Sequence, residues 1–124
     1  MEWQKAKKLI EEKVKENTDI NTNKSTYRIV KSIGSIPDNK SYGYCSEKGF
    51  IVPIGRNVTI SIPWKMLEKC FLPIASGEEY DGHYFSKNFP LQNNNHPCHV
   101  HAVGQIFVKA GIAKPKNKRA YIGV

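Results

Sequence analysis

Four side chains that can bind a metal ion lie within six residues near the end of the chain. The segment reads His-Pro-Cys-His-Val-His, and its candidate ligands are His96, Cys98, His99 and His101. Structural zinc sites usually combine ligand pairs from two separate places, and the spacing here supplies one place only. On a helix, His99 and His101 point about 160° apart, so both can bind one ion only in an extended segment. We therefore predict no metal site, with His99 on an apolar helix face making one hydrogen bond and His101 on the polar face.

An acidic segment just upstream offers a second kind of chemistry. Its ionisable side chains are Glu78, Glu79, Asp81 and His83. Carboxylates with a nearby histidine can bind Mg²⁺ or act as general acid and base, as a small nuclease would need. No nuclease motif is complete, and the segment is more typical of an acidic surface turn. A toxin-like nuclease that uses Asp81, His83 or residues 96–101 is therefore an alternative to the main hypothesis.

Nucleophile and cofactor motifs are weak throughout the chain. The three cysteines, Cys45, Cys70 and Cys98, are far apart and odd in number, which favours free thiols in a reducing compartment. The chain contains no G-x-S-x-G elbow, no phosphate-binding glycine loop and no dinucleotide fingerprint. The sequence thus predicts no cofactor, assigns no catalytic residue and favours a protein that is not an enzyme.

The last third of the chain carries charge of one sign. From Gly82 to Val124 there is no Asp or Glu, whereas six Lys and Arg residues give this stretch +6 of the formal net charge of +8. A positive surface attracts polyanions, and phosphate neutralisation supplies much of the affinity of proteins for nucleic acid. The candidate nucleic-acid-binding residues are His101, Gln105, Lys109, Lys114, Lys116, Lys118 and Arg119.

Two neighbouring segments supply these candidates. On the expected last helix, His101, Gln105 and Lys109 follow one another at intervals of four residues, so they would share a polar face toward a DNA groove. The basic loop 114–119 would grip phosphates, and residues 120–122 form a closing strand. This order over residues 97–124 resembles the end of a winged-helix domain in architecture, which implies a helix in the major groove and a basic wing on the backbone. The predicted function is therefore non-enzymatic binding of nucleic acid, duplex DNA in particular.

The elements that position these residues follow from hydrophobic periodicity. Helical spacing predicts helices over residues 2–17, 64–71 and 97–110, and alternation predicts strands over 26–33, 42–45, 49–54, 57–62 and 120–122. Residues 72–95 are expected to form an ordered loop whose aromatics, Tyr80, Tyr84, Phe85 and Phe89, pack on the core. Stacking of unpaired bases on them is the alternative. We predict one α+β domain over 1–124, with a small antiparallel sheet of about four to five strands, an N-terminal helix, and a C-terminal helix followed by the basic loop and the closing strand.

Composition sets the remaining expectations. A chain of 124 residues suits one domain. No signal peptide and no apolar run of about 20 residues is visible, so we expect a cytoplasmic protein without a membrane partner. An acidic partner protein, met by the basic face of an interaction or inhibitor module, is a further alternative, and the oligomeric state stays open. Abundant Lys, Asn and Ile are typical of an AT-rich microbial or viral genome.

Overall fold

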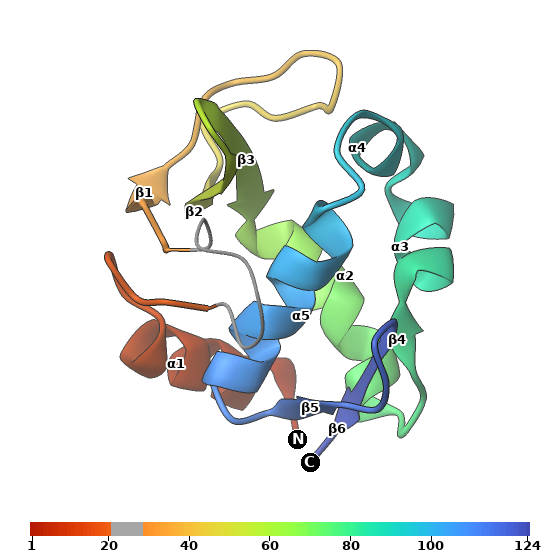
Figure 1. Ribbon diagram of the computed structural model, residues 1–124. Helices are drawn as coiled ribbons and strands as arrows, with labels where there is room; N and C mark the ends of the chain where they lie inside the picture. The colour runs from red at the N-terminus through yellow and green to blue at the C-terminus, as the bar shows by residue number, and fades with distance from the viewer. Residues whose placement is uncertain (21–28) are drawn as a thin grey trace.

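A computed structural model describes residues 1–20 and 29–124 of the chain. Five helices and six strands are defined in this part (Figure 1). The helices are α1 (Trp3–Lys13), α2 (Trp64–Ala75), α3 (Gly82–Asn88), α4 (Pro90–Asn95) and α5 (His99–Lys109). The strands are β1 (Ser32–Ser35), β2 (Lys48–Gly55), β3 (Val58–Pro63), β4 (Tyr80–Asp81), β5 (Ala113–Pro115) and β6 (Ala120–Gly123). The α+β class predicted from the sequence is confirmed.

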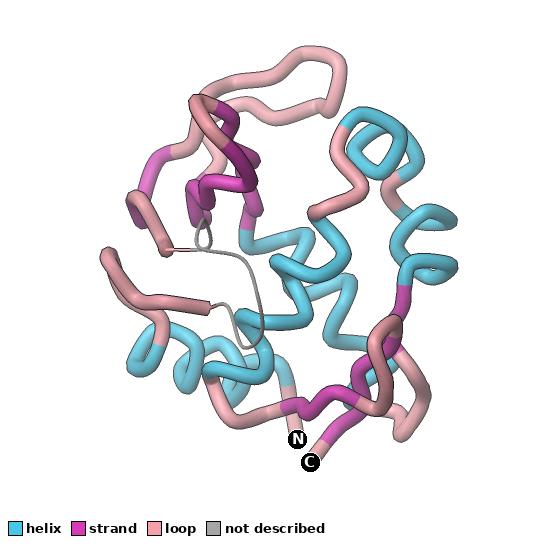
Figure 2. Tube along the Cα trace, in the orientation of Figure 1, coloured by secondary structure: helices cyan, strands magenta, loops and turns pink. Residues whose placement is uncertain are grey.

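The strands form two separate three-stranded antiparallel sheets, where the sequence predicts one sheet of about four to five strands. The first sheet has the order β1-β2-β3, and the second has the order β4-β6-β5. Figure 2 shows the two sheets at opposite ends of the molecule with helices between them. In the sequence, helices α2 to α5 separate β3 from the C-terminal strand β6. Strand β6 pairs with β4 and does not extend the first sheet.

The first sheet follows from local sequence signals. Phe50 and Val52 of β2 pair with Ile62 and Ile60 of β3, and all four side chains are buried. Asn57 closes the hairpin with a φ of 61°, a conformation that Asn tolerates better than most residues. The predicted hairpin between residues 49–54 and 57–62 is therefore confirmed.

Two other predicted strands are not found as predicted in the described residues. The predicted strand 42–45 does not form, and only an isolated bridge joins Asn39 to Tyr44. The predicted strand 26–33 lies partly outside the described residues, and its described end contributes to β1 and to a bridge between Asp19 and Ile29.

The segment 72–95 contains regular structure and is not the long loop that the sequence predicts. Helix α2 continues through Pro73 to Ala75, and β4, α3 and α4 follow. Asp81 caps α3 by accepting a hydrogen bond from the Tyr84 backbone N–H, and Pro90 occupies the first turn of α4. Helices α3 and α4 are too short for a helical period to be visible in the sequence.

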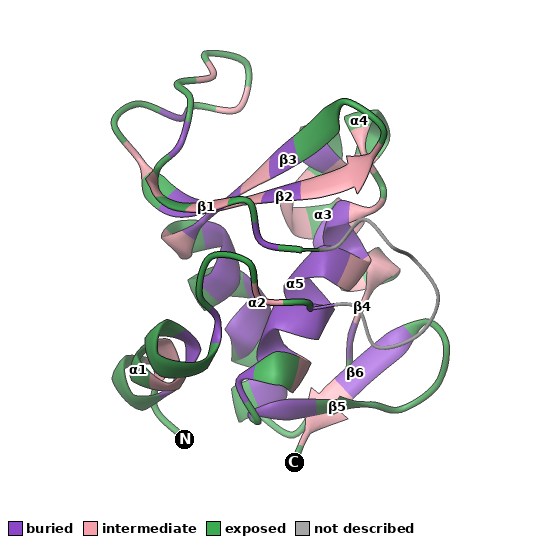
Figure 3. Cartoon of the chain, turned by 60° about the vertical axis from the view of Figure 1, so that its left-hand side comes forward, coloured by how far each residue is buried: buried purple, intermediate pink, exposed green. Residues whose placement is uncertain are grey.

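Helix α5 lies at the centre of the molecule. Eight of its eleven residues are buried, and Figure 3 shows the helix surrounded by the other elements. It packs against α1, α4, β3 and β5. Gly104 permits a close approach of α5 to β6, because a Cβ at this position would overlap the ring of Tyr121 on β6. In the part of the chain that the structure describes, no helix combines the length and apolarity needed to cross a bilayer.

Candidate functional site

The β5–β6 hairpin presents the basic loop at the surface. Residues 114–119 are all exposed. The Lys116 N–H donates to the Ala120 carbonyl at 2.9 Å, and the Arg119 N–H donates to the side-chain Oδ1 of Asn117 at 2.8 Å, so local hydrogen bonds shape the turn. We call Lys114, Lys116, Lys118 and Arg119 the hairpin tip. These four predicted binding residues lie together and are accessible to a ligand.

The acidic segment lies directly beside the hairpin tip. Asp81 of β4 pairs in register with Ala120 of β6, which brings the two segments together. Lys116 forms an ion pair with Glu79. Lys118 and Arg119 share a shallow pocket with Glu79 and Asp81. The positive charge of the hairpin tip is therefore partly neutralised by Glu79 and Asp81, which precede the acid-free last third of the sequence.

Helix α5 does not present the predicted row of binding side chains. Lys109 is exposed, and His101 is half-buried, with its Nδ1 3.1 Å from the Tyr121 hydroxyl. Gln105 is only 8% exposed, and its Oε1 has no hydrogen-bond partner among the described residues. The prediction that all three share an outward face is thus wrong at Gln105. Polar residues at intervals of four share one face of a helix, but this does not show that the face is exposed. Around Gln105, neighbouring elements bury that face of α5.

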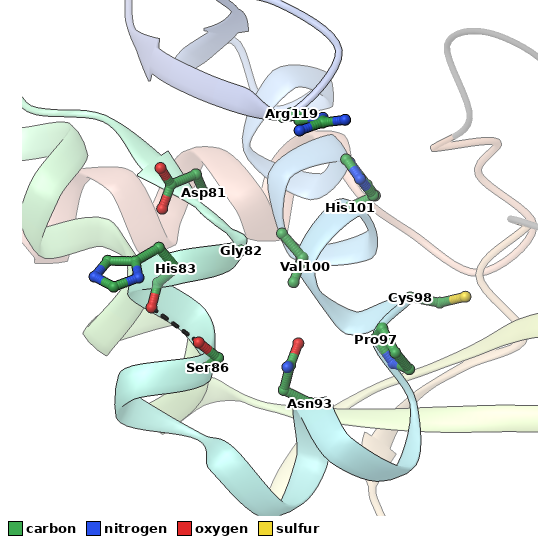
Figure 4. A pocket seen from close by; sticks show the side chains of 10 residues that line it. All are labelled: Asp81, Gly82, His83, Ser86, Asn93, Pro97, Cys98, Val100, His101 and Arg119. Atoms are coloured by element: carbon green, nitrogen blue, oxygen red, sulfur yellow. Dashed lines mark hydrogen bonds between the residues drawn. The ribbon is translucent and has the colours of Figure 1, made fainter.

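A pocket of about 610 Å³ lies beside the hairpin (Figure 4). Its walls come from β4, α3, α4, α5 and the hairpin tip. The ionisable side chains that line it are Asp81, His83, Cys98, His101 and Arg119. The fold therefore joins the two sets of candidates that the sequence suggests, since Asp81 and His83 belong to the acidic segment and His101 and Arg119 to the basic one.

The two sets occupy different sides of this pocket. In Figure 4, Asp81 and His83 lie on one side, His101 and Arg119 lie together on the other, and Val100 lies between them. Asp81 Oδ1 accepts the Tyr84 N–H at 2.9 Å, which fixes the carboxylate at the start of α3. The pocket can thus offer a negative group and a positive group to one ligand at separate points.

Uncharged side chains complete the pocket, and sequence reasoning missed them. Ser86 and Asn93 supply hydrogen-bonding groups, and Pro97 and Val100 supply apolar surface. Ser86 Oγ donates to the His83 carbonyl at 3.1 Å. No motif marks Ser86 or Asn93, because both lie in short helices that the sequence leaves as loop. The three asparagines 93–95 were the available signal, and they indicate only a polar segment.

The histidine-rich segment divides between two places. His99 is 2% exposed, stacks on Phe85 at a centroid distance of 5.6 Å and has its Nδ1 2.8 Å from the His96 carbonyl. Burial lowers the pKa of His99, and the hydrogen bond to the His96 carbonyl opposes this shift without cancelling it. His96 and His99 line a second, polar pocket of about 160 Å³, whereas Cys98 and His101 line the larger one. The predicted separation of His99 from His101 is confirmed. Across residues 1–20 and 29–124, no three His, Cys, Asp or Glu side chains cluster as a metal would require.

The aromatic side chains of residues 80–89 belong mainly to the core. Tyr80 and Phe85 are fully buried, and the Tyr80 hydroxyl donates to the Val100 carbonyl at 2.9 Å. Tyr84 donates its hydroxyl to the Lys69 carbonyl at 2.7 Å, and Phe89 packs against Phe85. Packing on the core is confirmed, and the buried rings cannot serve as a platform for stacked bases.

The three cysteines form no disulfide bond with one another, as predicted. Burial raises the pKa of the Cys70 thiol to about 12, so this sulfur is not a thiolate nucleophile near neutral pH. Cys45 is exposed, and Cys98 is half-buried at the wall of the larger pocket. The structure therefore places one thiol, Cys98, at the candidate site.

Comparison of the chain with known protein families, curated proteins and solved structures finds no match. A functional proposal for this protein consequently rests on the hairpin tip and the pocket beside it.

Proposed function

We propose that the protein binds nucleic acid, without cleaving it, through the exposed hairpin tip. The observation that carries the proposal is the convergence of Lys114, Lys118 and Arg119 on one exposed turn, in a chain with a formal net charge of +8. Lysine and arginine side chains on an exposed turn can neutralise phosphates and release counterions, which drives binding that does not depend on base sequence. Lys116 contributes less, because it already pairs with Glu79.

The order of elements supports a role for the hairpin. From α2 onward the chain forms a helix, a short strand, three helices and a hairpin whose second strand pairs with the earlier strand. In element order this resembles a winged-helix domain more fully than residues 97–124 alone do. The hairpin then corresponds to the wing, which contacts the nucleic-acid backbone. Helix α5, being buried, does not support the groove-reading part of that resemblance.

A preference for duplex DNA would require a helix that faces the groove, and α5 is mostly buried. The proposal therefore relies on phosphate contacts alone. We expect weak dependence on base sequence and strong dependence on salt concentration. Both a duplex and its single strand are therefore proposed ligands, and their relative affinity distinguishes a groove-spanning mode from a backbone-tracking mode.

The test is fluorescence anisotropy with a labelled duplex of about 20 base pairs and its single strand, at about 50 and 200 mM salt. Replacing Lys114, Lys118 and Arg119 together by Ala is expected to reduce the duplex salt slope by about 2.7, since each phosphate contact contributes about 0.9. The matched control replaces Lys5, Lys8 and Lys15, which are exposed near or on α1, and removes the same charge.

Two results would reject the proposal. One is a salt-independent signal for the unmodified protein. The other is an equal loss of affinity in the hairpin variant and in the control, which would show that net charge alone governs the interaction. Retention of an acidic protein in the presence of excess nucleic acid would instead support the interaction module.

A second candidate function is nucleic-acid hydrolysis in the larger pocket. The observation that favours it is the placement of Asp81 and His83 in one pocket with His101 and Arg119. The test is cleavage of a labelled strand with and without Mg²⁺. Asp81→Asn combined with His83→Ala is the sharpest variant, because Asn can still cap α3. Cleavage that survives this change belongs to a contaminant or another site, and hydrolysis in this pocket is then rejected.

A further inference from the structure

We infer that the larger pocket binds one unpaired nucleotide of the strand that the hairpin tip holds. The inference rests on the proposed function and adds a ligand class for a pocket that the tip alone does not use. Its volume of about 610 Å³ falls within the range of about 300–1,000 Å³ that is common for small-ligand sites. The ligand is a nucleoside monophosphate unit, supplied either by a strand or as a free nucleotide.

Arg119 links the pocket to the hairpin tip. It belongs to the exposed basic turn and also lines the pocket, so a strand bound along the turn passes the pocket opening. Figure 4 places the guanidinium next to His101 and away from His83. A guanidinium binds phosphate through paired, charge-assisted hydrogen bonds. This side of the pocket is thus suited to the phosphate.

Asp81 sets the direction in which the nucleotide lies. A phosphate is repelled by a carboxylate, so it binds on the Arg119 side and not beside Asp81. The Asp81 carboxylate can instead accept a hydrogen bond from a free sugar hydroxyl, which is the 2′-hydroxyl of a ribonucleotide or the 3′-hydroxyl of a terminal or free nucleotide. It keeps acceptor capacity for this bond beyond the bond to the Tyr84 N–H. A ligand with an anionic end and a hydroxyl donor meets both requirements.

The remaining wall suits a base. Val100 and Pro97 provide apolar surface for a ring face. The Asn93 side chain offers one donor and one acceptor group, a pair that matches the edge of a base, and Ser86 adds a hydroxyl. Asn93 is half-buried, so its amide is held at the wall and not fully solvated.

Three other pockets fit this ligand less well. The pocket over His99 has a volume of only about 160 Å³. The pocket between α2 and β6 has a volume of about 360 Å³ and is lined mainly by apolar residues, with no Lys, Arg or His among them. The shallow pocket that Lys118 and Arg119 share with Glu79 and Asp81 has a volume of about 370 Å³ and a cationic side, but Ala120 is its one apolar lining residue. Among these pockets, the larger one combines a cationic side and hydrogen-bonding groups with apolar surface for a base.

The experiment uses the full chain and isothermal titration calorimetry with adenosine monophosphate, adenosine and inorganic phosphate. Saturable binding of the monophosphate is expected, with weaker binding of the two fragments, because each fills one part of the pocket. Arg119→Ala should weaken monophosphate binding by about tenfold or more, as expected for loss of a charge-assisted hydrogen bond. Arg56→Ala, which removes an exposed arginine from the β2–β3 turn, is the control and should have no effect.

A second pair of variants tests the base wall. Asn93→Ala should weaken binding of both the monophosphate and adenosine, whereas Asn94→Ala, an exposed neighbour on the same helix, should not. No saturable binding up to about 10 mM, or equal affinity in all four variants, would overturn the inference.

Parallel measurements separate this inference from the proposed function and identify the source of the nucleotide. A strand that binds with hairpin-dependent salt sensitivity while the monophosphate does not bind leaves the function standing and overturns the inference. Monophosphate that displaces a duplex with an unpaired overhang more readily than a blunt duplex supports a strand as the source. Monophosphate binding without any such displacement overturns the strand assignment in favour of a free nucleotide.

Discussion

Helix α5 and the hairpin tip are neighbours in the sequence and opposites in the structure. The sequence predicts that both bind nucleic acid, because both carry basic or polar side chains at regular intervals. The structure buries eight of the eleven residues of α5 and exposes all of residues 114–119. One segment therefore determines how the domain is held together, and the other determines what its surface can contact.

The difference shows why polar spacing and exposure are separate properties. A helix on the surface has one apolar face, whereas α5 contacts elements on several sides and buries Gln105 along with Ile106 and Phe107. The hairpin tip is not enclosed in this way, and residues 114–119 are all exposed. Substitutions at buried positions of α5 that do not line the larger pocket should change stability and leave binding intact, and substitutions in the tip should do the reverse.

The largest effect is expected from Gly104→Ala on α5. The added Cβ would overlap the ring of Tyr121, which is 6% exposed and contacts His101 through its hydroxyl, so neither side can move freely. We expect a loss of about 3 kcal/mol in the free energy of unfolding, the upper range for overpacking a core. Urea unfolding measures it.

The control for this prediction is Gly55→Ala at the end of β2, where an added Cβ meets open space. Equal stability of the two variants would mean that α5 and β6 are not in close contact, and α5 would then not be a core helix on this side.

The next largest effect concerns Gln105, a predicted binding residue of α5 that is buried in the structure. Gln105→Met should leave the free energy of unfolding unchanged or raise it by up to about 1 kcal/mol, because the buried Oε1 lacks a partner. Nucleic-acid affinity should not change. Urea unfolding and anisotropy on the same variant test both expectations.

Gln92→Met is the matched control for that substitution. Gln92 is equally buried, but its Nε2 donates to the Tyr44 hydroxyl at 3.1 Å, so its loss leaves a buried hydroxyl without that partner. This variant should be destabilised by about 1 kcal/mol or more. A loss of nucleic-acid affinity in Gln105→Met, without such a loss in Gln92→Met, would restore α5 as a binding element.

Local patterns made part of the fold predictable. The alternation of apolar residues around Asn57 specified the β2–β3 hairpin, and the apolar spacing of Ala6 and Ile10 specified α1. The second sheet could not be predicted, because β4 has two residues and pairs with β6 at the far end of the chain. A strand this short has no alternation to detect, and its pairing depends on the packed helices between the two strands.

The candidate site was also predictable only in part from local sequence patterns. The residue types of Asp81, His83, His101 and Arg119 were visible in the sequence, since ionisable groups stand out in any segment. Their assembly into one pocket was not, because it depends on the non-local pairing of Asp81 with Ala120. The same pairing places Glu79 beside Lys116, so it also changes the charge of the surface that the sequence treats as purely basic.

A smaller effect distinguishes two lysines of the hairpin tip. Lys118→Ala should reduce the duplex salt slope by about 0.9, whereas Lys116→Ala should reduce it by less, because Lys116 already pairs with Glu79. Glu79→Gln should raise affinity by releasing Lys116 for phosphate. Anisotropy titrations over a salt series measure all three. Equal slopes for the two lysine variants would show that the ion pair does not persist when nucleic acid is bound.

The smallest effect concerns pH and the buried end of α5. Burial holds the pKa of His99 below its ordinary value of about 6.5, so the unfolded chain binds more protons than the folded one as pH falls through this window. The contribution of neutral His99 to stability is therefore complete above about pH 6.5 and decreases as pH falls toward the folded pKa. Urea unfolding between about pH 7.5 and 5.5 should show this decrease, and His99→Asn should flatten it. His83→Asn changes an exposed histidine and should keep the slope of the unmodified protein. If His99→Asn left the slope unchanged, the pH dependence of the free energy of unfolding would come from the other histidines. Burial of His99 at the start of α5 would then make no contribution to it.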